Sequence, residues 1–428
     1  MRINSLAFGN WKQRVRLAAT SLRWGRGSRY FEDEFIQFNM VDLVPVADHD
    51  CNRPRLNVIA PNLSASRAFG GLATQIGLPL EVFKNCLADK GWLIRFISYA
   101  SAPAAVDNIV SEYVNRLGVE ANSVSFHYVG EGSNKVPVAR RDLFLGSLWY
   151  NLPSALPLMQ FQHQNFETPR RPYISLVQDY EAGFHPWSSA YMMTLSAYDS
   201  DWPKRIVFNS SELASFYKAQ GHKFEQSVTF EPVLNARLRD SLLKPNPPPK
   251  ERQIIVYGRP GSRRNCFYLV RKSLEIWSRE YTSAGAWRVL SVGDQHDPFT
   301  LSGGATLEVV GKLTLAQYAD QLHRSAVGLS LMASPHPSYP PLEMAHFGAL
   351  TVCNNFQCKD MAAWHENMMP ALLMDPQHLA QQLIAACARF DADAATGFKG
   401  KTLKPHYLND VDPSVLQEIG DLIIQSMA

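Results

Sequence analysis

The stretch SPHPSYPPLEMAHFG, residues 334–348, decides how the rest of the chain is arranged. Four prolines in its first half fix φ and remove N–H donors, so this half is neither helix interior nor central strand. It follows an apolar run, residues 327–332, with the composition of a buried strand. Apolar residues then recur at helical spacing from Leu342 to Phe347, with Pro341 suited to the first helical position. The stretch therefore predicts a strand, a rigid loop and a helix.

The start of this predicted helix is a candidate ligand site. The N–H groups of a first helical turn have no partner within the helix and attract anions. Glu343 falls in that turn on the predicted boundaries, and a carboxylate beside an anion site suits ribose hydroxyls. The pattern favours a nucleotide-sugar diphosphate over the turn. The alternative is an ordinary proline-stiffened loop before a helix whose glutamate favours the helix dipole.

Length and composition exclude several classes of protein. A chain of 428 residues is longer than one core usually supports, so two domains are expected. A net charge of +3 is small for this length and argues against a nucleic-acid binder. Six cysteines form no CxxC pair or zinc-type cluster, so we expect reduced thiols and no metal. No membrane-spanning or secretory run is evident, which predicts a cytoplasmic protein.

Residues 1–50 are expected to form a basic, helical N-terminal extension. Residues 2–31 carry seven Lys and Arg residues, with no acid before Glu32, interleaved with apolar side chains. Such a segment suits the surface of an anionic membrane. A solvated helix packed on the body of the protein fits equally well, because the apolar stripe is not clean. A transit peptide has the same composition and is the third alternative.

Residues 51–243 alternate between strand-like and helix-like runs, which predicts an α/β domain with a mostly parallel sheet. Ligands of such sheets bind beyond the carboxyl ends of the strands. After the first strand, Gly70 and Gly71 allow close approach of a ligand to the backbone, although helix capping explains them as often. The predicted strands are residues 56–60, 92–98, 123–128, 142–145, 174–177 and 205–208.

Polar residues follow two of these strands and are candidate substrate contacts. Gln178, Asp179, Glu181 and His185 come after the strand at 174–177, where a solvated loop is the alternative. For His185, a role as a base is the less favoured interpretation. Asn209 follows the next strand, and there we slightly favour capping of the following helix over ligand binding.

A second α/β pattern follows a proline-rich linker. Residues 244–250, KPNPPPK, favour extended polyproline geometry and separate the two patterns. Residues 251–405 repeat strand–helix units, which predicts a second Rossmann-like domain. Residues 406–428 contain a capped amphipathic helix that we expect to pack back on the body.

Three basic residues in the second domain follow successive strands. Arg259, Arg264 and Lys312 are expected to converge on the edge where Glu343 lies, and Arg forks with a Lys point charge suit a diphosphate. Any one of them alone is more readily explained as a surface charge.

These motifs together resemble a known family. Two Rossmann-like domains that face each other across a cleft, with an acid after the diphosphate loop of the second, are the plan of GT-B glycosyltransferases. The segments GRPGSRRN, SVGDQH, KDMAAWHEN and residues 311–348 are similar to the WsaF rhamnosyltransferase family of rhamnan and surface-glycan synthesis. In the first domain, AFGG, LVQDYEAGFHPWSSAY and VFNSSEL resemble the same family. The resemblance covers roughly residues 52–400.

The resemblance implies transfer of L-rhamnose from dTDP-β-L-rhamnose to a hydroxyl of a growing bacterial surface glycan, free or lipid-linked, without a metal and with retention. It implies donor contacts from the diphosphate arginine, a donor-binding lysine and a tyrosine–glutamate pair with the glutamate on the ribose. It also implies a glycine loop that closes on the sugar phosphate and an acceptor-side polar pair. The predicted donor-site residues are Arg259, Arg264, Lys312, Leu313, Tyr339, Pro340, Glu343 and Gly70, and the predicted catalytic residues are Asp179, Gln178 and Gly71.

This chain departs from the broader retaining GT-B pattern at one place, and the stereochemistry of transfer is open. That pattern places a first acid before the ribose glutamate, and here Pro335 and His336 occupy the region. With retention the departing phosphate takes the acceptor proton, whereas with inversion Asp179 is the candidate base. The alternative functions are a GT-B transferase or epimerase for another nucleotide sugar, and a non-catalytic glycan-binding scaffold. The sequence leaves a homodimer open.

Overall fold

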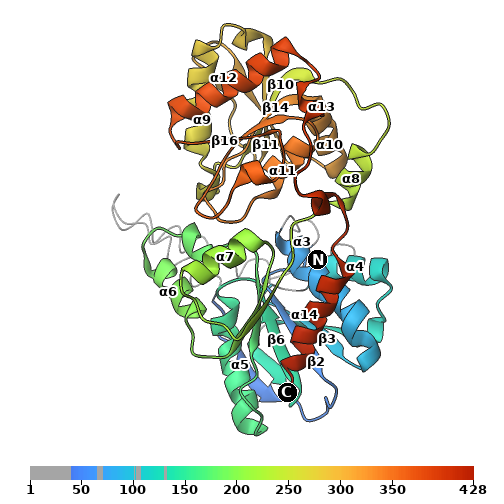
Figure 1. Ribbon diagram of the computed structural model, residues 1–428. Coiled ribbons are helices and arrows are strands. Elements are labelled where there is room, and N and C mark those ends of the chain that lie inside the picture. The colour runs from blue at the N-terminus through green and yellow to red at the C-terminus, as the bar shows by residue number, and fades with distance from the viewer. Residues whose placement is uncertain (1–39, 65–70, 101, 103–107, 130–132) are drawn as a thin grey trace, which may run out of the picture.

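The computed structural model of the protein describes residues 40–64, 71–100, 102, 108–129 and 133–428 (Figure 1). Gly70 and the basic segment 2–31 lie outside the described residues. Two seven-stranded sheets form the centres of two α/β domains. None of the helices in the described ranges is long and apolar enough to cross a bilayer.

The N-terminal domain is built on a parallel sheet with strand order β4-β3-β2-β6-β7-β8-β9. A small parallel pair, β1 (Val44–Ala47) and β5 (Lys135–Val138), lies beside it. Side chains of β2 are buried on both faces, as expected for a central parallel strand. The strands of the sheet are β2 (Arg55–Ala60), β3 (Leu93–Ser98), β4 (Val124–Tyr128), β6 (Asp142–Gly146), β7 (Tyr173–Val177), β8 (Lys204–Phe208) and β9 (Gln226–Thr229).

Helices cover both faces of this sheet. Leu56 and Val58 of β2 belong to the core cluster that α3 shares, whereas Ile59 belongs to the cluster that α5 shares. The helices of this part of the chain are α3 (Gly71–Val82), α4 (Ile109–Leu117), α5 (Asn151–Asn165), α6 (Ser189–Tyr198) and α7 (Ser211–Ala219).

The C-terminal domain repeats the plan with strand order β12-β13-β11-β10-β14-β15-β16, in which only the β12–β13 pair is antiparallel among the described pairs. Helices α9 and α12 share one core cluster, while α10 and α11 share the cluster on the other face. The strands are β10 (Glu251–Gly258), β11 (Arg288–Gly293), β12 (Phe299–Thr300), β13 (Thr306–Gly311), β14 (Ser325–Leu329), β15 (Leu350–Asn354) and β16 (Met368–Ala371). The helices are α9 (Phe267–Glu280), α10 (Leu315–Arg324), α11 (Tyr339–His346), α12 (Pro376–Ala392) and α13 (Thr396–Lys399).

The proline-rich segment 244–250 is not the place where the chain changes domain. Helix α8 (Ala236–Leu242), which the sequence assigns to the first domain, packs on α10 of the second. Leu234 and Leu238 are buried in the second domain's core, whereas Phe230 is buried in the first domain's core. The chain therefore crosses between the domains at residues 231–233, and the prolines lie between α8 and β10. The apolar residues before the prolines, rather than the prolines themselves, set the boundary.

The C-terminal helix returns to the N-terminal domain. Helix α14 (Pro413–Gln425) is capped by Asp412, whose Oδ1 accepts a hydrogen bond from the Ser414 N–H at 2.9 Å. Its apolar face, with Leu422 and Ile423 fully buried, joins the first domain's core. A Cβ on Gly420 would lie 2.5 Å from the Cβ of Cys86, so glycine is required for this close approach. Figure 1 shows α14 lying on the N-terminal domain, which confirms that the helix packs back on the body.

Helix α11 begins at Tyr339, two residues before the predicted position. Pro340 and Pro341 both fit its first turn, because their missing N–H groups would have no partner within the helix. Glu343 consequently lies in the second turn, and the first-turn prediction for it is wrong. The two prolines also remove half of the four N–H groups that were expected to bind an anion. An anion bound at the start of α11 would therefore have to be neutralised mainly by positively charged side chains.

Candidate functional site

The loop after β7 meets the loop after β14 at the boundary between the domains. Asp179 follows β7 and is 7% exposed. Its Oδ1 accepts a short hydrogen bond from the Ser334 hydroxyl, and its Oδ2 lies 3.5 Å from Arg264 Nη1. The Arg264 guanidinium also lies 4.1 Å from the ring centre of Phe184. Asp179 is therefore held by two residues of the opposite domain.

Burial sets the chemistry of Asp179. Desolvation raises the pKa of its carboxyl, and the Arg264 charge and the Ser334 hydrogen bond oppose this effect without cancelling it. The result is a buried carboxyl with a raised pKa at a domain boundary, which is the usual setting of a functional acid or base.

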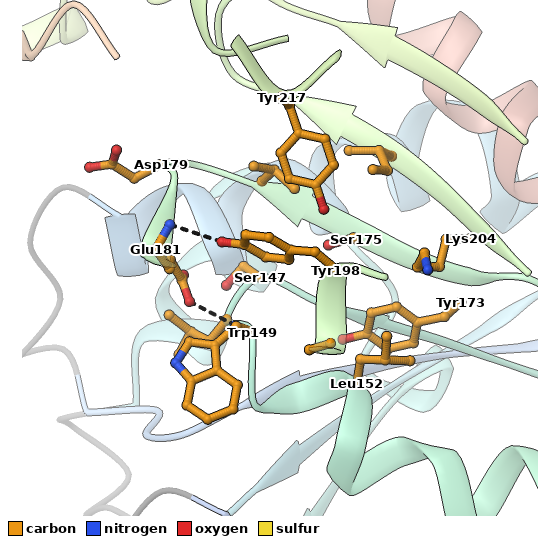
Figure 2. Close-up of a pocket in the computed structure, with 14 residues that line it drawn as sticks. Ser147, Trp149, Leu152, Tyr173, Ser175, Asp179, Glu181, Tyr198, Lys204 and Tyr217 are labelled. Atoms are coloured by element: carbon orange, nitrogen blue, oxygen red, sulfur yellow. Dashed lines mark hydrogen bonds between the residues drawn. The ribbon is translucent and has the colours of Figure 1, made fainter. Parts of the chain in front are cut away.

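Glu181 lies near Asp179 in sequence but faces elsewhere. Its Oε2 accepts a hydrogen bond from the Trp149 N–H at 2.7 Å, and burial raises its pKa to about 8. Figure 2 shows the Asp179 carboxylate pointing away from the Glu181 carboxylate. Both residues line a cavity of about 20 Å³ beside β6, β7 and β8, large enough for one or two waters but not for a sugar. The hydroxyls of Ser147 and Tyr173 in this cavity have no partner in the described part of the chain.

His185 and Asn209, the other two candidate substrate contacts on the acceptor side, have different surroundings. The His185 ring packs edge-on to Trp149, with ring centres 6.4 Å apart. Asn209 is buried, and its N–H donates to the Val177 carbonyl at 3.2 Å. Helix α7 is capped by Ser210, whose hydroxyl accepts from the Leu213 N–H at 3.1 Å, so the capping interpretation of Asn209 is wrong. Ser210 has the β-region backbone that a cap requires.

The start of α3 lies against the same boundary. A Cβ on Gly71, the first residue of α3, would lie 3.3 Å from Gln178 Oε1, so the predicted pair Gly71 and Gln178 are neighbours. One turn later, the Thr74 side chain hydrogen-bonds the Tyr339 hydroxyl of the second domain. The predicted glycine loop and the predicted donor helix are thus brought together.

The three predicted basic residues make different contacts. Arg259 Nε lies 3.3 Å from Asp294 Oδ1, and Lys312 interacts electrostatically with both of these side chains. Partial desolvation lowers the pKa of Lys312, Arg259 adds to this effect, and Asp294 opposes it. Arg264 instead turns to Asp179 in the other domain. Arg264 follows β10 on a loop that reaches the other domain, and the convergence of all three basic residues stays a prediction.

Glu343 lies one helical turn from Tyr339, on the same face of α11. The Tyr318 hydroxyl of α10 donates to Glu343 Oε2 at 2.9 Å, and burial raises the pKa of Glu343 to about 7. Burial also raises the pKa of Tyr339 to about 12. Leu313 packs on the core beside Tyr318, and Pro340 is half-buried in the first turn.

Sequence reasoning passed over a buried lysine near Asp179. Lys359 is 2% exposed, and its Nζ donates to the Met332 carbonyl at 2.8 Å. Burial lowers its pKa to about 8, and the nearby Asp179 carboxyl partly opposes this change. Lys359 comes five residues after the end of β15, and this position beyond a strand end is the one signal for it in the sequence, although it does not reveal the burial. Among the described residues, no group of three or more His, Cys, Asp or Glu side chains is placed to hold a metal ion.

Comparisons with known proteins place the chain in a family. A model of the WsaF N-terminal domain matches residues 55–211, and a model of the WsaF C-terminal domain matches residues 252–384. The O-antigen biosynthesis protein RfbC of Myxococcus xanthus is 32% identical over 182 residues, which make up 42% of this chain and 13% of RfbC. The chain thus matches only a small part of that relative.

Solved structures share the fold at low identity. The sucrose-phosphate synthase of Thermosynechococcus elongatus has a TM-score of 0.52 and 14% identity, covering 87% of this chain and 99% of its own. WaaG, a glycosyltransferase involved in lipopolysaccharide biosynthesis, has a TM-score of 0.52 and 11% identity, covering 86% and 99%. These likenesses show the two-domain GT-B fold. Because the two family models together match more than half of the chain, the protein belongs to the WsaF family.

Proposed function

We propose that the protein is a glycosyltransferase of bacterial surface-glycan synthesis that transfers L-rhamnose from dTDP-β-L-rhamnose to a hydroxyl of a growing glycan, with retention and without a metal. The observation that carries the proposal is the placement of Arg259, Lys312 and Glu343 on one domain, with Asp179 of the other domain held against it. The names of RfbC and WaaG, which refer to O-antigen and lipopolysaccharide biosynthesis, support the glycan class.

In this proposal the second domain binds the donor. Glu343 accepts a hydrogen bond from a ribose hydroxyl, and Tyr318 holds the carboxylate in place. Arg259 and Lys312 bind the diphosphate and offset the negative charge that develops on it as the glycosyl bond breaks. The ion pair with Asp294 orients Arg259 before the donor arrives. These cations take the part that a metal plays in other transferases.

The first domain then binds the acceptor at the end of β7. Asp179 and Gln178 lie where the acceptor hydroxyl must approach the sugar, and Gly71 allows the backbone of α3 to come close. With retention, the departing phosphate oxygen takes the proton of the acceptor hydroxyl. Contact between the domains excludes water and limits hydrolysis of the donor.

We expect Asp179→Asn to keep turnover within about tenfold of wild type, because under retention no strong base is needed. The asparagine still accepts a hydrogen bond from Ser334. The measurement is kcat with saturating donor, together with the anomeric configuration of the product by NMR. A loss of about 10²- to 10⁴-fold with an inverted product would instead assign Asp179 as the general base.

Isothermal titration of the wild-type protein with dTDP-β-L-rhamnose, dTDP and UDP-glucose tests the donor assignment. We expect both thymidine ligands to bind and UDP-glucose to bind at least about tenfold more weakly, since a misfitted donor loses at least one good hydrogen bond. Equal or tighter binding of UDP-glucose would contradict the assignment of dTDP-β-L-rhamnose as the donor. Binding of glycan without any nucleotide sugar would indicate a scaffold.

A further inference from the structure

His336 lies in the proline-rich loop between β14 and α11, and its two ring nitrogens have different surroundings. Its Nδ1 accepts a hydrogen bond from the Ser338 N–H at 3.0 Å. The backbone N–H of His336 donates to the Ser334 hydroxyl at 3.0 Å. Because Nδ1 is an acceptor here, the neutral ring carries its proton on Nε2. Ser338 has a φ of 71°, so this bond also stabilises an unusual turn just before the helix.

The Nε2–H of His336 has no hydrogen-bond partner among the described residues, although the side chain is buried, with 3% exposed. A buried donor without an acceptor costs free energy, and native proteins rarely keep one without a reason. The ring does not take up a second proton at physiological pH. Burial and the charges of Lys359 and Arg264 lower its pKa to about 3, so it stays neutral at physiological pH.

The position of the ring indicates what the missing acceptor is. Along the chain, His336 stands between two residues that contact the other domain, Ser334 with Asp179 and Tyr339 with Thr74. Its ring centre is 5.5 Å from that of Tyr339. In the proposed function the nucleotide lies at Tyr339 and Glu343, and the acceptor approaches at Asp179. The part of the donor between these points is the diphosphate with its sugar.

We propose that the Nε2–H of His336 donates a hydrogen bond to a hydroxyl oxygen of the donor's glycosyl unit, so that His336 recognises the sugar rather than the nucleotide. The inference rests on the proposed function. A neutral donor suits a neutral hydroxyl, whereas the diphosphate charge is met by Arg259 and Lys312. His336 thereby occupies the region where the broader GT-B pattern has an acid, and it offers the sugar a donor instead of an acceptor.

Two substitutions separate the sugar contact from the turn. In His336→Asn the amide oxygen can replace Nδ1 and accept from Ser338, but nothing replaces Nε2. In His336→Gln the longer amide places an N–H near the position of Nε2. Each variant and the wild type are titrated calorimetrically with dTDP-β-L-rhamnose and with dTDP, and thermal unfolding is recorded to confirm that each variant is folded.

We expect His336→Asn to weaken the binding of dTDP-β-L-rhamnose by about tenfold, while the affinity for dTDP changes by less than about twofold. His336→Gln should regain most of the lost affinity for the sugar nucleotide. Equal weakening of both ligands would overturn the inference in favour of a phosphate contact or a structural role, and no weakening of either would overturn it outright. Failure of the wild type to bind any nucleotide refutes the proposed function itself, an outcome visible before any variant is made.

Discussion

Replacing Glu343 by alanine is expected to weaken the binding of dTDP-β-L-rhamnose and of dTDP alike by about 10- to 100-fold. In the proposed function the substitution removes a charge-assisted hydrogen bond to the ribose, and such a bond is typically worth about 1.5–3 kcal/mol. Both ligands carry the ribose, so the effect should not depend on the sugar. Calorimetric titration measures it, and an affinity within about threefold of wild type would remove Glu343 from the donor site.

The pH dependence of binding gives an independent check on Glu343. Its pKa of about 7 in the free protein means that protonated and ionised forms are both present near neutrality. A ribose hydroxyl donates to the ionised form, so binding lowers this pKa and releases a proton. Affinity should therefore rise as pH increases from 5.5 towards 7.5, by at most about tenfold per unit, and level off above. The adjoining phenols of Tyr318, Tyr339 and Tyr407 have raised pKa values and stay protonated in this range.

Two variants serve as controls for this experiment. Glu343→Gln keeps the size of the side chain and an oxygen that can accept from Tyr318 or ribose, but it cannot ionise. It should lose the pH dependence and part of the affinity. Glu308→Gln removes an exposed carboxylate of the same domain that pairs with Arg288 at 2.6 Å, and it should change neither.

Asp142→Asn is expected to lower the free energy of unfolding of the N-terminal domain by about 3–5 kcal/mol. Asp142 is fully buried, and its two oxygens lie 2.7 Å from Arg55 Nε and 2.9 Å from Arg55 Nη2. Arg95 Nη2 lies 3.8 Å from the same carboxylate. Burial lowers the pKa of Arg95 to about 10, which shows how costly its charge already is. Removing the shared anion leaves two buried guanidinium groups with too little negative charge.

Asp48→Asn is the matched control for this prediction. Asp48 contacts the same Arg55, at 3.1 Å from Nη1, but its side chain is partly exposed to water. Its loss should cost no more than about 1 kcal/mol. Urea unfolding followed by tryptophan fluorescence compares the two variants. Similar midpoints for Asp48→Asn and Asp142→Asn would mean that the buried carboxylate stabilises the domain no more than the partly exposed one does.

Local patterns in the sequence were sufficient to predict most elements of the fold. The predicted strands at 56–60 and 174–177 agree with β2 and β7 to within a residue, and the capped helix expected within residues 406–428 is α14. Such features depend on side-chain periodicity and capping, which act between residues close in sequence. The domain boundary was placed too late, because burial of Leu234 and Leu238 is decided by distant partners on α10.

The site was predicted less completely for the same reason. The rule that strand ends carry ligands pointed to Asp179, Arg259 and Lys312, but it cannot tell which side chains turn to the other domain. Arg264 contacts Asp179, 85 positions earlier in the numbering, and this pairing exists only after both domains have folded. The burial of Lys359 likewise comes from tertiary packing, so its sequence position alone does not distinguish it from a surface lysine.

The return of α14 to the N-terminal domain has a mechanical consequence. The chain passes between the domains twice, at residues 231–233 and again between Tyr407 and α14. The two passages are tied together, since the Leu234 N–H donates to the Tyr407 carbonyl at 2.7 Å. Two adjacent strands of chain that are bonded to each other act as a door hinge: they permit swinging about one line and resist twisting and sliding. If the domains part when a donor binds in the proposed function, Asp179 should therefore return to Ser334 along a single arc.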